Sequence, residues 1–245
     1  MKKSLFTLEH TRQLTEDTYE LVLSGDTSAI TAPGQFVNIE LPGKFLRRPI
    51  SICNWSDGAL MLLVKVVGAG TKELARSVPG TELDVLSGLG NGFDIRLAGE
   101  HPVLAGGGIG VAPLYGLARR MIEAGTAPTV ALGFRAGKDA FYLEEFARLG
   151  CRLLIATEDG SLGTKGFVTD CIRAVPACDY VLACGPLPML KAVHALPQLT
   201  GGQFSFEARM GCGFGACMGC TVPTRDGYKR VCKDGPILYK EEIVW

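Results

Sequence analysis

The sequence predicts a β-barrel plus α/β architecture: an N-terminal antiparallel β-barrel, a Rossmann-like parallel α/β domain and a small C-terminal iron–sulfur subdomain. Residues 1–99 contain short strands separated by turn signals, and residues 100–200 repeat a strand, a glycine turn and a helix. Residues 201–245 hold clustered cysteines. At 245 residues and 47% hydrophobic, the chain is long enough for two compact units and a small third.

The charge balance excludes some partners. With 25 basic and 25 acidic residues the net charge is zero, so nothing calls for a nucleic acid or an anionic membrane. The first residues lack an apolar stretch long enough for a signal peptide, and the uncharged run 102–118 is short for a membrane span and interrupted by glycines. We therefore expect a cytoplasmic protein, whose nine cysteines are reduced thiols or metal ligands.

The first hundred residues read as strands. Alternating apolar positions occur at Tyr19, Leu21 and Leu23 and at Val37, Ile39 and Leu41. Residues 60–67 (LMLLVKVV) form a nearly continuous apolar run, and glycine-containing turns separate the segments. Many short strands in one block predict an antiparallel barrel or a sandwich.

The next hundred residues repeat a different unit. Four segments are each a strand that runs into a glycine turn: PVLAGGGIG, TVALGFRAG, RLLIATEDG and YVLACGPLP. After the first, one helical face carries Leu114, Leu117, Ala118, Met121 and Ile122. Such repetition predicts a doubly wound parallel sheet, with a seam near Ala98–His101 and a linker at QLTGGQ, residues 198–203.

The C-terminal cysteines have a metal-ligand spacing. Cys212, Cys217 and Cys220 are spaced C-x4-C-x2-C and Cys232 follows, which is the plant-type ferredoxin arrangement for a 2Fe-2S cluster. Glycines at 211, 213, 215 and 219 suit a loop that folds tightly around sulfur. A four-cysteine zinc site and free thiols are the alternatives, but zinc sites usually pair two C-x2-C units.

Two further signals indicate nucleotide binding. Arg48 and Lys65 can meet phosphates, and residues 68–71 (GAGT) offer a backbone turn with a hydroxyl, although taken alone an edge strand and a plain turn are the commoner explanations. The turn at 105–113 (AGGGIGVAP) departs from G-x-G-x-x-G, and its glycines could serve helix–sheet contact alone. Cys184 would end a strand at the carboxyl edge of the sheet, where ligands bind, whereas the other four scattered cysteines are expected in the core.

The order of these motifs resembles the ferredoxin–NADP reductase superfamily. RPIS, a GxGT turn, GGGIGVAP, CGPxPM and the C-terminal cysteines follow one another along essentially the whole chain. The tail, EARMGCGFGACMGC with VCKDGPI, is more specific and resembles the electron-transfer subunits of NAD-dependent, type B dihydroorotate dehydrogenases.

The resemblance implies three cofactors and their residues. FAD would be bound by Arg48, Pro49, Ile50, Ser51, Leu63, Val64, Lys65, Gly70 and Thr71. NAD would be bound by Gly107, Gly108, Ile109, Gly110, Cys184, Gly185 and Pro186. The 2Fe-2S cluster would be ligated by Cys212, Cys217, Cys220 and Cys232. No side chain is expected to act as an acid or base, and Cys184 would lie near flavin and nicotinamide.

The resemblance also implies a division of labour. An FMN-containing catalytic partner subunit would oxidise dihydroorotate in pyrimidine (UMP) biosynthesis, within a heterotetramer of two catalytic and two electron-transfer chains. Electrons would pass singly through the cluster to FAD and leave as a hydride to NAD+. Because a cluster must lie near its electron donor, we expect the partner to dock at the apolar, glycine-rich surface around Phe214 and Met218. The alternatives are a reductase subunit of another complex, of the hydrogenase or sulfite-reductase type, and a colourless, zinc-containing nucleotide sensor.

Overall fold

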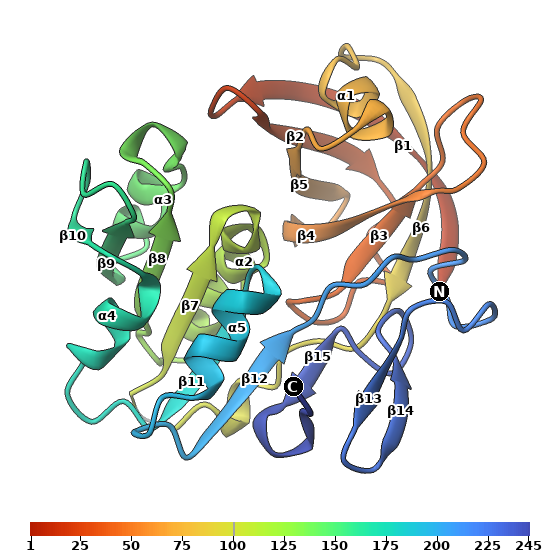
Figure 1. Ribbon diagram of the computed structural model, residues 1–245. Coiled ribbons are helices and arrows are strands. Elements are labelled where there is room, and N and C mark those ends of the chain that lie inside the picture. The colour runs from red at the N-terminus through yellow and green to blue at the C-terminus, as the bar shows by residue number, and fades with distance from the viewer. Residues whose placement is uncertain (100) are drawn as a thin grey trace.

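The computed structural model describes residues 1–99 and 101–245 (Figure 1). The predicted seam and the boundary between 99 and 100 include Glu100, which lies outside the described residues. Among the helices described, none is both long and apolar enough to cross a membrane.

The N-terminal unit is a closed antiparallel barrel, as predicted. Its strands pair in the order β1-β2-β5-β4-β3-β6. They are β1 (Lys2–Gln13), β2 (Thr18–Gly25), β3 (Phe36–Ile39), β4 (Arg48–Ser56), β5 (Ala59–Lys65) and β6 (Glu82–Leu89), with α1 (Ala69–Ala75) between the last two. Of the alternating apolar residues that predicted strands, Leu21, Leu23, Val37 and Ile39 are fully enclosed in the barrel core, although every residue of β3 is buried.

The second unit is a seven-stranded sheet in the order β10-β9-β8-β7-β11-β12-β15. Its strands are β7 (Val103–Gly107), β8 (Thr129–Phe134), β9 (Arg152–Thr157), β10 (Thr164–Lys165), β11 (Tyr180–Cys184), β12 (Gly201–Ser205) and β15 (Ile237–Tyr239). All neighbours are parallel except β12 and β15. The predicted parallel α/β domain is confirmed.

Helices cover both faces of this sheet. They are α2 (Val111–Glu123), α3 (Leu143–Arg148), α4 (Val168–Arg173) and α5 (Leu187–His194). The described residues also form the 3-10 turns η1 (Ile95–Leu97), η2 (Gly108–Gly110), η3 (Gly137–Asp139) and η4 (Lys240–Glu242). Along β7, Leu104 shares a buried cluster with residues of α2 and α3, whereas Val103 and Ala105 share one with α4 and α5. The nearly continuous apolar strands are therefore buried on both sides.

The expected linker at 198–203 is wrong, because β12 begins within it, at Gly201. A β-carbon on Gly202 would lie 2.9 Å from the Val181 side chain, so the strand packs against β11 through its backbone rather than through apolar side chains. The sheet thus extends past the predicted domain boundary at residue 200, and the division itself stays a prediction.

The cysteine-rich segment is an excursion between β12 and β15. It contains a two-stranded hairpin, β13 (Thr221–Thr224) and β14 (Gly227–Arg230), which lies below the barrel in Figure 1. Ser205 pairs with Ile237 at the base of the excursion. The segment therefore begins and ends at two adjacent strands, β12 and β15, of the seven-stranded sheet.

The barrel and the sheet are in direct contact. Helix α2 approaches β4 so closely that a β-carbon on Gly116 would lie 2.5 Å from the Cys53 carbonyl oxygen. Nearby, the buried Glu20 accepts from Tyr142 Oη at 2.5 Å and from Arg12 at 2.9 and 3.1 Å. These contacts fix the barrel over the carboxyl ends of the parallel strands.

Candidate cofactor sites

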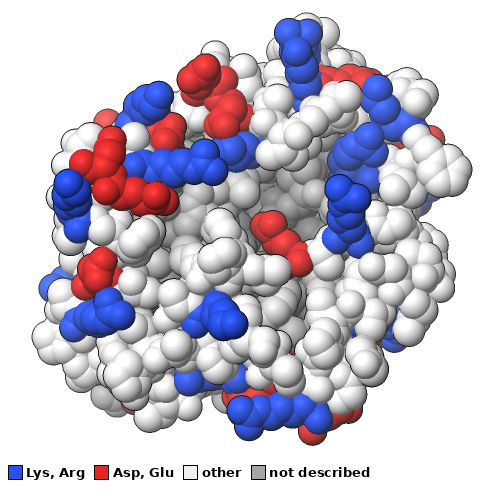
Figure 2. Space-filling view, in the orientation of Figure 1, with Lys and Arg blue, Asp and Glu red and all other residues white. Residues whose placement is uncertain are grey.

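Two adjoining cavities lie between the barrel and the carboxyl ends of the sheet strands. The larger measures about 640 Å³ and the smaller about 270 Å³. Figure 2 shows the hollow between the two units. Lys65, Ile109 and Glu207 line both cavities, so ligands in the two would meet along a shared wall. This is where open parallel sheets bind ligands.

The smaller cavity collects most of the residues predicted for FAD. Pro49, Ile50, Ser51, Leu63, Lys65 and Thr71 line it. Val64 does not: strand alternation turns its side chain into the barrel core, where it is fully buried, so only its backbone could take part.

The predicted phosphate turn lies beside this cavity. Gly70 lies against the Arg48 guanidinium so closely that a β-carbon there would overlap it. Thr71 Oγ1 accepts hydrogen bonds from the backbone N–H groups of Val67 at 2.9 Å and Gly68 at 3.2 Å, which closes the turn. The cation, the glycine and the hydroxyl are therefore together, in an arrangement that fits a flavin nucleotide.

The residues predicted for NAD line the two cavities. Gly107, Gly108, Ile109, Gly185 and Pro186 line the larger one, and Gly110 and Cys184 line the smaller one. A β-carbon on Gly110 would overlap the Cys184 carbonyl, and one on Gly185 would lie 2.7 Å from Met189 Cε. The glycines therefore allow the turn after β7 to pack closely against the turn after β11. The same glycines line the cavities, so they can serve both helix–sheet packing and the approach of a ligand.

Cys184 lies at the strand end, as predicted. Burial raises the pKa of its thiol to about 12, so the group is neutral at physiological pH. It is therefore an uncharged wall of the cavity rather than a thiolate nucleophile.

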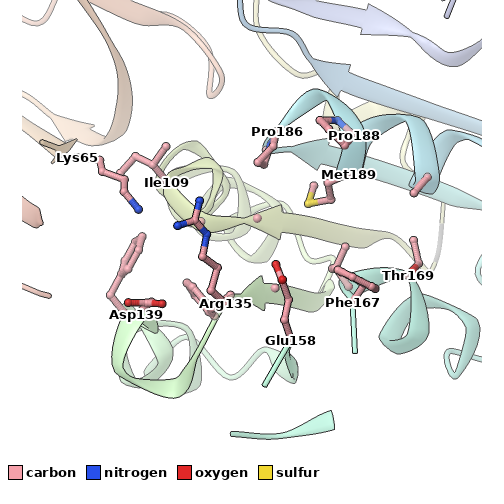
Figure 3. A pocket seen from close by; sticks show the side chains of 18 of the residues that line it. Lys65, Ile109, Arg135, Asp139, Glu158, Phe167, Thr169, Pro186, Pro188 and Met189 are labelled. Atoms are coloured by element: carbon pink, nitrogen blue, oxygen red, sulfur yellow. The ribbon is translucent and has the colours of Figure 1, made fainter. Parts of the chain in front are cut away.

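The sequence did not identify several polar side chains of the larger cavity. Arg135, Asp139 and Glu158 come from the strand-end turns after β8 and β9 (Figure 3). Of the neighbouring acids Glu158 and Asp159, Asp159 closes the turn by accepting hydrogen bonds from the backbone N–H and the hydroxyl of Ser161, whereas Glu158 lines the cavity. Their positions just after predicted strands could have indicated a ligand site. The sequence does not show which of these side chains face the cavity, because that depends on the conformation of each turn.

Glu207 is a second residue that the sequence did not single out as a ligand contact. It follows β12 and lines both cavities, and burial raises the pKa of its carboxyl group. Its place depends on β12 joining the sheet, which the sequence did not reveal.

The four C-terminal cysteines form two pairs. The backbone N–H groups of Cys212 and Cys217 each donate to the other's Sγ at 3.4 Å, and Cys220 is paired with Cys232 by one such bond. Backbone N–H groups are directed at sulfur: Ala216 donates to Cys212 Sγ at 3.2 Å, and Cys232 donates to Cys220 Sγ at 3.4 Å. Within the described residues, no three candidate metal ligands converge on a single point. Two thiol pairs fit the two irons of a 2Fe-2S cluster better than one zinc ion.

Glycines let the loop backbone lie close to the cysteine sulfurs. Gly213 and Gly215 adopt φ values of +78° and +92°, which favour glycine, and a β-carbon on Gly211 would lie 3.1 Å from Cys217 Sγ. Although burial opposes it, hydrogen bonds from the backbone of Cys217, Phe214 and Ala216 lower the pKa of Cys212 to about 6. Burial raises the pKa of Cys232 to about 12, so loading of metal there must displace a proton.

Comparisons with known proteins agree with this geometry. Residues 207–244 match the iron-sulfur cluster binding domain of dihydroorotate dehydrogenase B, and residues 104–195 match the oxidoreductase NAD-binding domain. A dihydroorotate dehydrogenase B (NAD(+)) electron transfer subunit from Geobacillus sp. (strain WCH70) is 43% identical over 100% of this chain and 99% of its own. The subunit of Shouchella clausii (strain KSM-K16) is also 43% identical, over 99% and 98%.

The chain belongs to the family of dihydroorotate dehydrogenase B electron transfer subunits. The expected resemblance is thereby confirmed. Among solved structures, the family fold matches an NADH-dependent reduced ferredoxin–NADP oxidoreductase with a TM-score of 0.89 and 31% identity, over 98% of this chain and 90% of that one. A cytochrome P450 reductase of Amycolatopsis matches with a TM-score of 0.68 and 25% identity, over 78% and 64%.

Proposed function

We propose that this electron transfer subunit carries electrons from the FMN of a dihydroorotate dehydrogenase catalytic subunit, through a 2Fe-2S cluster and FAD, to NAD+. The proposal rests on one observation: the chain combines two pairs of neighbouring cysteines with two cavities that share a wall. The family supports the direction and the role in pyrimidine synthesis. When bound, the flavin exchanges single electrons with the cluster and a hydride with the nicotinamide.

The chain's own residues supply binding and orientation. Arg48 and the turn at Gly70–Thr71 would hold the flavin phosphates, while Ser51 and Cys184 border the cavity for the ring. In the larger cavity, Ile109 and Pro186 are apolar walls, and Glu158 offers an acceptor to a ribose hydroxyl. A carboxylate there favours NAD over a nucleotide with an extra phosphate. Hydride transfer to NAD+ would itself need no acid or base, but the flavin would take up one proton with every two electrons that arrive singly from the cluster.

The purified chain is expected to be coloured by its cofactors and to lack dihydroorotate oxidation when it is alone. It should contain one FAD and one 2Fe-2S cluster, reduce dyes with NADH, and fail to oxidise dihydroorotate. The measurement is an anaerobic absorption spectrum with flavin, iron and zinc analysis on the same sample. A colourless, zinc-containing chain would overturn the cofactor assignment, and dihydroorotate oxidation by this chain alone would overturn the division between subunits.

We infer that the catalytic subunit docks at the cysteine loop, in a complex of two catalytic and two electron-transfer chains. Phe214 and Met218 stand out from this loop, with 43% and 55% of their surfaces exposed, and Met218 adopts a left-handed φ of +60°. An apolar side chain held outward in a costly conformation indicates a contact surface.

Replacing both residues by lysine (Phe214→Lys with Met218→Lys) is expected to slow dihydroorotate-to-NAD turnover by about tenfold or more, because a buried interface charge is costly. NADH–dye activity should remain at the wild-type rate. Val78→Lys, on the loop after α1 and 66% exposed, is the matched control. Turnover in the double variant equal to that of Val78→Lys would refute this docking site.

A further inference from the structure

Strand β3 separates the flavin cavity from the cysteine loop. Its residues alternate: Val37 and Ile39 point into the barrel core, whereas Phe36 and Asn38 belong to the opposite face. Phe36 lines the smaller cavity and shares a buried cluster with Cys220 and Cys232. The outer face of this short strand therefore touches both predicted redox sites.

Asn38 makes the polar contact on this face. Its side-chain Nδ2 donates to the backbone carbonyl oxygen of Cys212 at 3.1 Å, and the residue is only 1% exposed. The next residue of the loop, Gly213, packs so closely on the amide that a β-carbon there would overlap Asn38 Nδ2. The barrel thus holds the loop at its first predicted cluster ligand, two residues along the strand from a wall of the flavin cavity.

Folding alone does not explain an asparagine at this position. Its Oδ1 is buried and has no hydrogen-bond partner within the described residues. A buried acceptor without a partner destabilises the fold, whereas a leucine, which has the same branching and number of side-chain heavy atoms, has no polar group that needs a partner. The benefit of the amide lies in its other end, in the bond to the Cys212 carbonyl.

We propose that Asn38 is a positioning residue for electron transfer between flavin and cluster. It fixes the Cys212 loop against the strand that walls the flavin cavity, and so sets the separation and orientation of the two centres. It touches the backbone of a ligand rather than the metal, as residues behind metal ligands commonly do. This inference rests on the proposed electron path.

The test follows both centres after one reductant is added. The anaerobic chain is mixed with NADH in a stopped-flow instrument, and flavin bleaching and cluster bleaching are recorded separately. In Asn38→Leu, flavin bleaching is expected at the wild-type rate, while cluster bleaching slows by about tenfold or more. A second readout is independent of turnover: the reduced cluster should show an altered electron paramagnetic resonance spectrum, and a chelator should remove its iron faster.

Two other variants make the result decisive. Thr27→Val removes part-buried hydrogen bonds that join only barrel residues: Thr27 Oγ1 donates to the Ser56 carbonyl at 2.8 Å and accepts from the Gly58 N–H at 3.2 Å. Should the leucine variant not fold, Asn38→Asp carries the test, since it keeps the volume but turns oxygen toward the carbonyl.

The possible outcomes are distinct. Cluster bleaching, spectrum and iron loss that match Thr27→Val would overturn the role of Asn38. A wild-type chain whose cluster never bleaches with NADH would instead overturn the electron path itself. Slowed cluster bleaching with unchanged flavin bleaching supports the proposal.

Discussion

Replacing Cys232 by serine is expected to abolish electron flow between the catalytic subunit and NAD+. The side chain is 1% exposed and the Cys232 backbone N–H donates to Cys220 Sγ at 3.4 Å, so its loss would remove one of the two ligands that we propose for one iron. Because changes behind a ligand already cost 10- to 100-fold, loss of a ligand should lower dihydroorotate-to-NAD turnover by at least about 100-fold. NADH–dye activity should persist, since the dye takes electrons from the flavin.

The control for this variant is a cysteine of equal burial outside the site. Cys178 is 3% exposed and lines neither cavity, so Cys178→Ser should keep its iron and its turnover. Iron content and the visible spectrum distinguish the two variants. A Cys232→Ser chain that retains a full cluster would show that another group is the fourth ligand.

Replacing Gly110 by alanine is expected to damage both stability and nucleotide use. The backbone φ of −61° suits alanine, so the effect is purely steric: the new β-carbon would overlap the Cys184 carbonyl and lie 2.6 Å from the Gly185 nitrogen. Backbone atoms on both sides cannot yield, so we expect a loss of about 3 kcal/mol in the free energy of unfolding. Displacement of the two turns should lower kcat/KM for NADH–dye reduction by about 100-fold.

Gly108→Ala, in the same turn, provides the comparison. A β-carbon there meets nothing within 4 Å, and the cost is limited to its left-handed φ of +52°, about 1 kcal/mol. Urea unfolding and NADH–dye kinetics measure both variants. If Gly110→Ala proved no less stable than Gly108→Ala, the interlocking of the two turns would not be what requires glycine.

Local spacing carried most of what the sequence could predict. The C-x4-C-x2-C motif and the strand–glycine–helix repeats are short patterns, and the structure brings both to the expected places. The face of α2 is also right: Leu114, Leu117, Ala118 and Met121 are buried. Each of these features depends on neighbours within a few residues along the chain.

What the sequence could not predict depends on tertiary contact. The sequence predicts a linker where strand β12 begins, because Gly201 and Gly202 pack through their backbone and leave no apolar pattern. Without β12 in the predicted sheet, the sequence gives no reason to expect Glu207 at the cavity wall. Asn38 gave no signal either, since its partner is the carbonyl of a residue far along the chain, Cys212.

The pairing of Ser205 with Ile237 has a consequence for how this subunit is assembled. The cysteine-rich segment is not a separate domain added at the end of the chain. It is inserted between β12 and β15, which are adjacent strands of the seven-stranded sheet. Its base is closed by ladder hydrogen bonds, whatever happens at its tip. We therefore expect a chain that loses its iron to keep β12 and β15 paired at the base of this segment.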